Sequence, residues 1–223
     1  MIQDVKKELI KYGKLAGEKN FTPGVSGNLS ARLNDKVLIT TSGSANGYLD
    51  ENDFALTDFE GNSLEEDKKP SSEKMLHIEF YKTRPDINYI IHVHSPYLSA
   101  FAACRIPLDE PLMAENVFYF GQIPLADYGL PSSNDLVEKT AKYFKDYSAV
   151  LMANHGVIIG GKTIKEAYLK LELAEAYAQT ILNAKILGGA APLTEHEAAQ
   201  INSLKKCCAE PAFLTPKEET EWN

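Results

Sequence analysis

The chain has 223 residues, of which 44% are hydrophobic and 24% charged, and its formal net charge is −8 at pH 7. This composition is typical of a globular protein that is long enough to bury a sizeable core. The acidic balance argues against a nucleic-acid groove, which needs positive charge, and no apolar run reaches the roughly 18 residues of a membrane span.

The first half of the chain predicts one helix, three short strands and the loops that separate them. An amphipathic pattern over residues 2–19 indicates the helix. Apolar, β-branched residues indicate the strands, and Gly, Ser and Asn indicate the loops. The strands are expected at residues 29–33, 36–41 and 54–58, the first two forming a hairpin, and the loops at residues 22–28 and 42–47.

The rest of the chain, from residue 71 onward, predicts helices in separate blocks and further short strands. Hydroxyl side chains are expected to cap three of these helices, and Gly188 is expected to end the longest. We expect helices at residues 73–82 (capped by Ser71 or Ser72), 97–104, 134–144 (capped by Ser132 or Ser133), 163–187 (capped by Thr163) and 195–206, and strands at residues 88–94, within 115–128, at 149–153 and at 157–159.

These elements do not alternate as βαβ units, so they predict an α/β protein with a largely antiparallel or mixed sheet covered by helices. No repeat, low-complexity segment or long linker interrupts the pattern. We therefore expect residues 1–223 to form a single domain, in which residues 190–223 make a short helix and a tail.

The cysteines and the N-terminal segment indicate the cellular compartment. Cys104, Cys207 and Cys208 are an odd number without the spacing of a disulfide framework, which predicts reduced thiols in a cytoplasmic protein. The adjacent pair Cys207-Cys208 is open to a redox role, but two ordinary thiols are the simpler interpretation. The charged segment Met1–Glu8 differs from a signal peptide.

Three histidines follow apolar runs in a way that favours a metal site. His92 and His94 lie in a predicted strand, where residues two apart point to the same face, so their imidazoles are expected to converge. His155 follows another apolar run and directly precedes Gly156. Two histidines on one strand and a third on a loop suit a three-histidine site with an open position. The alternative for each histidine is a hydrogen-bonded core residue.

Three polar segments are candidates for holding an anion such as phosphate. They contain Ser, Thr, Asn and Gly, whose small side chains allow a ligand to approach backbone N–H groups. One of them precedes a predicted helix. The alternative for each is an ordinary turn or helix cap. The segments are Ser26-Gly27-Asn28, Thr41-Ser42-Gly43 and Ser71-Ser72.

Glu73 follows the last of these segments directly and is the candidate proton acceptor. The alternative is a solvated carboxylate that matches the dipole of a helix N-terminus. His77 lies one helical turn later, and we interpret it as structural, because a fourth neutral ligand would close the metal site. His196 lies in a polar segment and is expected to be exposed.

Five motifs occur together in a fixed order, and the combination is far more specific than any one of them. They are Ser26-Gly27-Asn28, Thr41-Ser42-Gly43, Pro70-Ser71-Ser72-Glu73, His92-Val93-His94 and Asn154-His155-Gly156. In order and approximate spacing they resemble the class II aldolase/adducin family, and within it the branch that cleaves fuculose phosphate. The resemblance runs from about residue 5 to residue 190.

The resemblance implies a three-layer α/β/α fold and a homotetramer with active sites between subunits. It implies zinc as the cofactor, with Mn²⁺, Fe²⁺ and Co²⁺ also suited to three histidines. The implied activity is reversible cleavage of a ketose 1-phosphate into dihydroxyacetone phosphate and an aldehyde. The implied metal ligands are His92, His94 and His155, with Glu73 as the base, and the implied phosphate site comprises Asn28, Ser42, Gly43, Ser71 and Ser72.

The chain departs from the fuculose-phosphate branch at the aldehyde end of the site. Tyrosines from a neighbouring subunit and from the C-terminal tail serve that end in the branch, whereas residues 111–115 and 204–208 here have no Tyr at the matching places. We expect Glu115, or failing that Tyr119, to supply the proton donor across a subunit interface. The alternative for Glu115 is a surface or interface charge.

Other members of the family define the competing functions. An L-ribulose-5-phosphate 4-epimerase is less favoured, because that branch has Asp where this chain has Glu73. A methylthioribulose-1-phosphate dehydratase or a decarboxylase of phosphorylated oxo-acids stays open, because the metal site would be shared. A non-catalytic adducin-like module would lack the three histidines, all of which are present.

Overall fold

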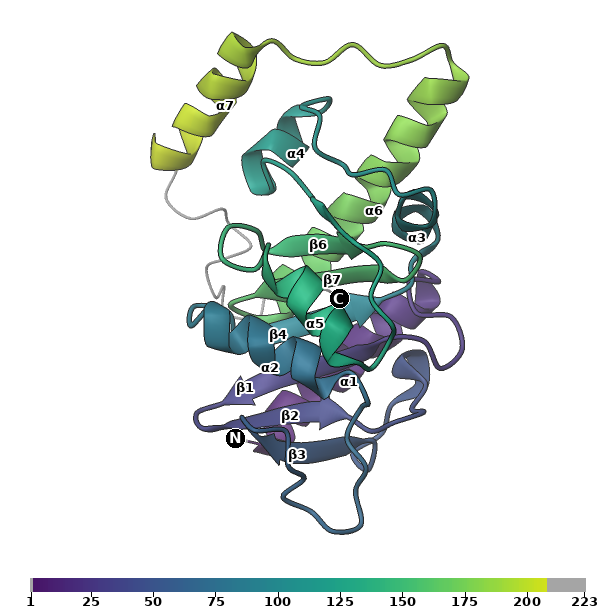
Figure 1. Cartoon of the computed structure of the whole chain (residues 1–223), viewed down its shortest axis with the longest axis vertical. Coiled ribbons are helices and arrows are strands. Elements are labelled where there is room, and N and C mark those ends of the chain that lie inside the picture. Colours follow the sequence, from purple (N-terminus) through teal and green to yellow (C-terminus); the bar gives the residue numbers. More distant parts are fainter. Residues whose placement is uncertain (1, 208–223) are drawn as a thin grey trace, which may run out of the picture.

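A seven-stranded mixed sheet forms the middle of the computed structural model, which describes residues 2–207 (Figure 1). The strand order is β3-β2-β1-β4-β7-β6-β5. Within the described residues, β5 and β6 are parallel and the other neighbouring pairs are antiparallel. The prediction of a mostly antiparallel sheet is therefore confirmed.

The elements have the following bounds. The strands are β1 (Asn28–Leu33), β2 (Lys36–Thr40), β3 (Phe54–Asp58), β4 (Tyr89–Val93), β5 (Leu125–Ala126), β6 (Ala149–Met152) and β7 (Gly156–Gly161). The helices are α1 (Ile2–Glu18), the short 3₁₀ helix η1 (Asn46–Tyr48), α2 (Lys74–Thr83), α3 (Pro96–Ala103), α4 (Ala114–Tyr119), α5 (Asn134–Ala141), α6 (Ile164–Ile186) and α7 (Glu195–Cys207).

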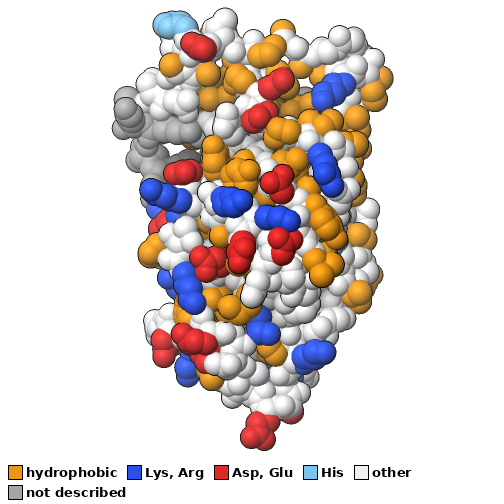
Figure 2. All heavy atoms as spheres, in the orientation of Figure 1, with side chains coloured by type: hydrophobic (Ala, Val, Ile, Leu, Met, Phe, Trp, Pro, Cys, Tyr) orange, Lys and Arg blue, Asp and Glu red, His pale blue; other side chains and the backbone are white. Residues whose placement is uncertain are grey.

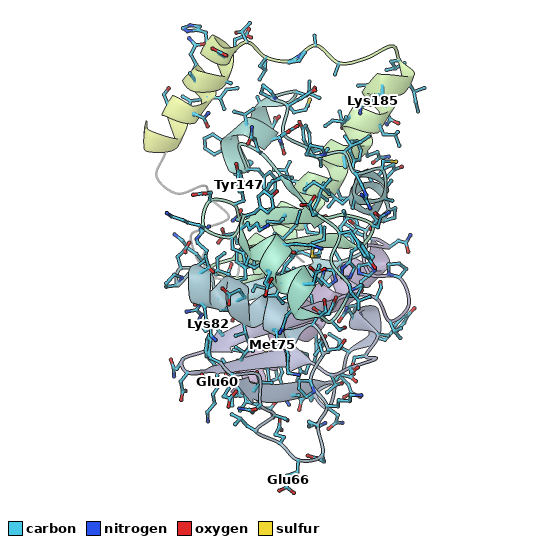
Figure 3. The ribbon with its side chains drawn as sticks, viewed as in Figure 1. Glu60, Glu66, Met75, Lys82, Tyr147 and Lys185 are labelled. Carbon is cyan, nitrogen blue, oxygen red and sulfur yellow. The ribbon has the colours of Figure 1, made fainter. Side chains whose placement is uncertain are left out.

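Helices cover both faces of the sheet, which gives the expected α/β/α layers. Side chains alternate along each strand, so Ile91 packs into a core under α1, α3 and α6, whereas Ile90 packs into a second core under α2 and α5. Figure 1 shows α2 and α5 in front of the sheet and α6 behind it. Met75 and Lys82, labelled in Figure 3, mark the first and last turns of α2.

The helix caps match the sequence in two of three places. Ser133 and Thr163 cap α5 and α6, their hydroxyls accepting hydrogen bonds from backbone N–H groups. The expectation that Ser71 or Ser72 caps α2 is wrong, because Glu73 occupies the N-cap position without a side-chain cap bond. The Ser71 hydroxyl instead accepts from the N–H of Glu73.

The prediction of short strands over residues 115–128 is also wrong at its start. Residues 114–119 form helix α4, and β5 is a strand of two residues. Asn116 and Val117 are buried, α4 contacts α6 and α7, and Gly121, at φ +71°, follows the last residues of the helix. Tertiary packing on one face therefore outweighs the strand propensity of Val, Phe and Tyr.

Cys104 is an exposed free thiol, whereas the side chains of Cys207 and Cys208 lie outside the described part of the chain. None of the helices within residues 2–207 has the length and apolarity needed to cross a bilayer. On the face formed by α2 and α5, acidic and basic side chains are interspersed (Figure 2).

Candidate metal centre

The antiparallel sheet brings the three histidines together. β4 pairs with β7 so that Val93 lies opposite Val157, which places the end of β4 beside the turn that leads from β6 into β7. His92 and His94 come from the end of β4, and His155 comes from that turn. Each pair of rings has its centroids 4.9 Å apart, and one ligand nitrogen from each ring lies within 4.8 Å of the others. The expected convergence is therefore found.

Backbone contacts and burial prepare the rings to act as ligands. The Nδ1 of His92 lies 2.9 Å from the carbonyl oxygen of Val157, so it donates its proton there and turns Nε2 toward the group. Burial, followed by the positive charge of His92, lowers the pKa of His94 to about 3 and that of His155 to about 4. Both rings are consequently neutral near pH 7, as metal ligands must be.

The spacing of the nitrogens fits a small divalent ion. The Nε2 atoms of His92 and His94 are 3.2 Å apart. Two nitrogens bound tetrahedrally at a zinc distance of about 2.0–2.1 Å would be separated by about 3.3 Å. Burial alone would lower the pKa of His92, but the adjacent Glu73 carboxylate raises it. A proton and a metal ion would therefore compete for this nitrogen.

Glu73 faces the histidines from the N-cap position of α2. Its Oε2 lies 3.1 Å from Nε2 of His92, and its Oε1 lies 3.3 Å from Nε2 of His155. The side-chain amide of Asn28 donates to Oε2 at 3.0 Å. Burial would raise the pKa of Glu73, but the positive charge and hydrogen bond of His92, the charge of His155 and the Asn28 bond together hold it well below its usual range. Glu73 is thus an ionised carboxylate at the edge of the group.

The three polar segments meet beside Glu73. Asn28 lies opposite His92 in the β1–β4 register. The N–H of Ser42 donates to Lys69 and the N–H of Ser71 donates to Thr40, so the turn at residues 41–44 runs alongside residues 69–72. Ser42, Gly43 and Ser72 are exposed, whereas Asn28 and Ser71 are buried. The residues expected to hold phosphate therefore lie on neighbouring segments, one of which contacts Glu73 directly through Asn28.

The loop before β1 is fixed by a residue that the sequence did not single out. The buried amide of Asn46 donates to the carbonyl of Ser26 at 2.9 Å and to the hydroxyl of Thr22 at 3.2 Å. Gly27 has φ +75°, and a Cβ there would lie 2.3 Å from the carbonyl oxygen of His92. The sequence shows Asn46 as an Asn in a Gly-rich polar loop. Such residues are common in ordinary turns, so the pattern alone does not indicate a structural role.

Substituting Gly27 with alanine is expected to disturb the metal centre. The positive φ alone costs a non-glycine residue about 1–2 kcal/mol, and the collision with the backbone of β4 adds about 1–3 kcal/mol. Gly24→Ala is the matched control, because Gly24 has φ +63° with no atom within 4 Å of the added Cβ. Urea unfolding and metal titration of both variants would measure the difference. Equal losses of stability and of metal affinity in the two variants would contradict a destabilising collision between the Cβ added in Gly27→Ala and the His92 carbonyl.

Other candidate residues lie apart from the histidine group. His77 is fully buried with Nδ1 2.7 Å from the hydroxyl of Ser30, and burial followed by the charge of His92 lowers its pKa to about 3. It is outside the ligand group found among the described residues. His196 is exposed on α7, as expected. Glu115 is exposed on α4, at a cleft between α4 and α6 that does not include the histidines.

The comparisons with known proteins agree with this geometry. The family model for the Class II Aldolase and Adducin N-terminal domain matches residues 7–182. The chain is 38% identical to an L-fuculose phosphate aldolase of Methanocaldococcus jannaschii, over 80% of this chain and 96% of the relative. It is 35% identical to a 3-oxo-tetronate 4-phosphate decarboxylase of Haemophilus influenzae, over 78% of this chain and 85% of the relative.

The fold gives the same assignment. The solved structure of an L-fuculose 1-phosphate aldolase superposes with a TM-score of 0.85 and 34% identity, covering 91% of this chain and 96% of that one. Sequence motifs, sheet topology and the converging histidines thus agree with one another. The chain belongs to the class II aldolase and adducin family.

Proposed function

We propose that this protein is a divalent-metal-dependent lyase that cleaves a ketose 1-phosphate into dihydroxyacetone phosphate and an aldehyde. The observation that supports this most is the ionised Glu73 carboxylate, 3.1 Å and 3.3 Å from ring nitrogens of His92 and His155. A base beside a group of neutral metal ligands is what bond cleavage next to a carbonyl requires. L-fuculose 1-phosphate is the first substrate to test.

His92, His94 and His155 would hold the ion, and zinc suits three imidazoles best, although Mn²⁺, Fe²⁺ and Co²⁺ are also compatible. When bound, the metal supplies Lewis-acid stabilisation of the negative charge that develops on the substrate. With the metal bound, all three imidazoles would be neutral, so they would leave the positive charge of the ion undiminished. The tautomer of His92 is set by the Val157 carbonyl.

The polar turns would bind the phosphate. The hydroxyls of Ser42, Ser71 and Ser72 and the N–H groups of Gly43 and Ser72 would donate hydrogen bonds without adding charge, whereas the N–H groups of Ser42 and Ser71 already donate to Lys69 and Thr40. Ser71 and Ser72 precede the N-terminus of α2, whose dipole favours an anion. Asn28 would contribute its amide from β1. Holding the phosphate there places the neighbouring carbons of the substrate toward Glu73.

Glu73 would move the proton at the reacting carbon. In cleavage, the C4 hydroxyl loses its proton to a base at the aldehyde end, the bond between C3 and C4 breaks as C4 becomes the aldehyde carbon, and C3 takes a proton. Glu73 would first take up that proton from solvent and then pass it to C3. In synthesis, Glu73 removes the same proton before C3 attacks the aldehyde. The Asn28 amide fixes the carboxylate at 3.0 Å, so the base is held in place before substrate arrives.

A product assay tests this proposal. Metal-loaded protein would be given ketose 1-phosphates, L-ribulose 5-phosphate and 3-oxo-tetronate 4-phosphate, with and without a chelator. We expect a ketose 1-phosphate to release dihydroxyacetone phosphate together with an aldehyde, and the chelator to abolish this release. Loss of CO₂ from 3-oxo-tetronate 4-phosphate also leaves dihydroxyacetone phosphate, so dihydroxyacetone phosphate formed from that substrate alone, or epimer formation alone, would reject the aldolase assignment.

Decarboxylation of a phosphorylated oxo-acid is the second candidate, because a 3-oxo-tetronate 4-phosphate decarboxylase is 35% identical to the chain. Loss of CO₂ also leaves negative charge beside a carbonyl, so the same ligands and phosphate turns would serve it. The aldehyde end of the site would distinguish the two reactions, and that end is where this chain departs from the fuculose-phosphate branch.

We propose that Glu115 serves the aldehyde end from a neighbouring subunit of a cytoplasmic homotetramer. Because α4 packs on α6 and α7 and its cleft does not include the histidines, this role requires a second copy of the chain. Glu115→Gln is expected to lower the cleavage rate about 10²-fold, as for loss of a general acid–base residue, because in cleavage Glu115 would accept the C4 hydroxyl proton that it donates in synthesis.

Mixing subunits tests the shared site. Glu115→Gln and His94→Ala subunits, each far less active alone than the unsubstituted protein, are expected to regain activity when reassembled together, because some sites then combine an intact His94 with an intact Glu115. An unchanged cleavage rate in Glu115→Gln would leave Glu115 as a surface charge.

A further inference from the structure

A buried carboxylate on α6 binds the segment that follows the second metal-ligand candidate. Glu175 is 5% exposed and lies on the face of α6 that packs against the sheet. Its Oε2 accepts hydrogen bonds from the hydroxyl of Ser95 at 2.6 Å and from the N–H of Leu98 at 2.9 Å, and its Oε1 accepts from the N–H of Tyr97 at 2.7 Å. All three donors belong to one turn.

This turn is the start of α3, and Glu175 takes the role of its missing cap. Ser95 is the N-cap residue, but its side chain makes no cap bond, because its hydroxyl donates to Glu175 instead. An N-cap side chain ordinarily accepts from one of the next N–H groups, whereas Glu175 accepts from both Tyr97 and Leu98. A negative charge at a helix N-terminus is also favourable. The N-terminus of α3 is thereby fixed to α6.

His94 lies between this fixed turn and the end of the sheet. β4 ends at Val93, which pairs with Val157, so the backbone of His94 is outside the ladder. The next residue, Ser95, is completely buried and bonded to Glu175. Gly156 packs against the ring, since a Cβ there would lie 2.7 Å from Cδ2 of His94. The position of His94 therefore depends on where Ser95 is held.

His92 and His94 differ in how their rings are oriented. The Nδ1 of His92 has the Val157 carbonyl as a partner. Among the hydrogen bonds of residues 2–207, the ring of His94 has only its contact with the ring of His92. A histidine ligand whose ring has no orienting hydrogen bond is positioned by its backbone. Here Glu175 of α6 holds the backbone that follows His94.

We propose that Glu175 is a positioning residue for metal binding, which holds His94 in line with His92 and His155 through the Ser95 turn. This inference rests on the proposed function only in requiring that the histidines bind a divalent ion. It assigns a role to α6 in the metal centre, although no residue of that helix is a candidate ligand.

The test is a Co²⁺ titration of metal-free protein, read by visible absorption. Glutamine has the shape of glutamate, but one of its two terminal atoms is an amide nitrogen that cannot accept a hydrogen bond. Glu175→Gln therefore breaks at least one of the three bonds to the turn. We expect its Kd for Co²⁺ to rise about 10- to 100-fold, with altered absorption bands, as found when groups supporting a metal ligand are lost. Glu166→Gln is the matched control: Glu166 is also 5% exposed on α6 and accepts from the N–H of Lys162, away from the histidines. Its Kd and spectrum should stay those of the unsubstituted protein.

A pair of smaller substitutions keeps the test decisive if Glu175→Gln does not fold. Ser95→Ala removes one of the three bonds and should weaken Co²⁺ binding several-fold, whereas Ser99→Ala on the same helix removes a hydroxyl without a hydrogen-bond partner and should not. Unchanged Co²⁺ affinity and spectrum in Glu175→Gln and Ser95→Ala would overturn the positioning role alone. Failure of the unsubstituted protein to bind Co²⁺ would overturn both this role and the proposed metal dependence.

Discussion

Replacing His94 with alanine is expected to abolish metal binding and to lower the cleavage rate by about 10³-fold or more. Three histidine nitrogens lie within 4.8 Å of one another, and removing one leaves two ligands, too few to hold a catalytic zinc ion. Lewis-acid stabilisation is worth several kcal/mol, and each 1.36 kcal/mol is a factor of ten in rate. Metal content after dialysis and release of dihydroxyacetone phosphate would be measured on the same sample.

His196→Ala is the control for this variant, because His196 is exposed on α7. It should retain both metal and activity. A His94→Ala protein with full cleavage activity would remove the metal mechanism from consideration, whereas one that keeps its metal but loses activity would shift the role of His94 from ligand to substrate contact.

Glu73→Gln is expected to separate chemistry from metal binding. Glutamine has the shape of glutamate but cannot accept a proton, so kcat should fall by about 10²–10⁴-fold, the usual contribution of a general acid–base residue. The histidines are untouched, and metal affinity should change far less than in His94→Ala. The direct measurement is exchange of the C3 proton of dihydroxyacetone phosphate with deuterated solvent, which requires the base but no aldehyde.

Glu79→Gln is the matched control, since Glu79 is a partly buried glutamate of the same helix. Within residues 2–207, the ion pairs of His92 and His155 are with Glu73 and not with Glu79. Its exchange rate should equal that of the unsubstituted protein. Exchange at the full rate in Glu73→Gln would show that another group moves the proton, and would direct attention to water or to a neighbouring subunit.

The convergence of the histidines could be predicted because it depends on local geometry. Residues two apart on a strand share a face, and that rule places His92 and His94 together without any knowledge of the fold. His155 was identifiable from its position after an apolar run and before Gly156. Its distance from the pair could not be derived from the residues alone, because it depends on β7 pairing with β4 across more than 60 residues of intervening sequence.

The parts that failed or were missed depend on contacts distant in sequence. Val-Phe-Tyr in residues 117–119 indicates a strand, but packing against α6 and α7 makes it helical. Glu175 is an acidic residue on the otherwise apolar face of a predicted helix, which is a signal of a buried hydrogen-bonded carboxylate. Its partner segment, around Ser95, could be found only from the structure.

A metal ion that is bound by three histidines and required for cleavage is the central feature of the proposed mechanism. The most direct test adds Zn²⁺ stepwise to chelator-treated protein while bound metal and cleavage of L-fuculose 1-phosphate and other ketose 1-phosphates are followed together. We predict that activity rises in proportion to bound metal and stops rising at one ion per histidine group. Full cleavage of any of these substrates by metal-free protein, or metal binding that leaves all of them uncleaved, would contradict the account.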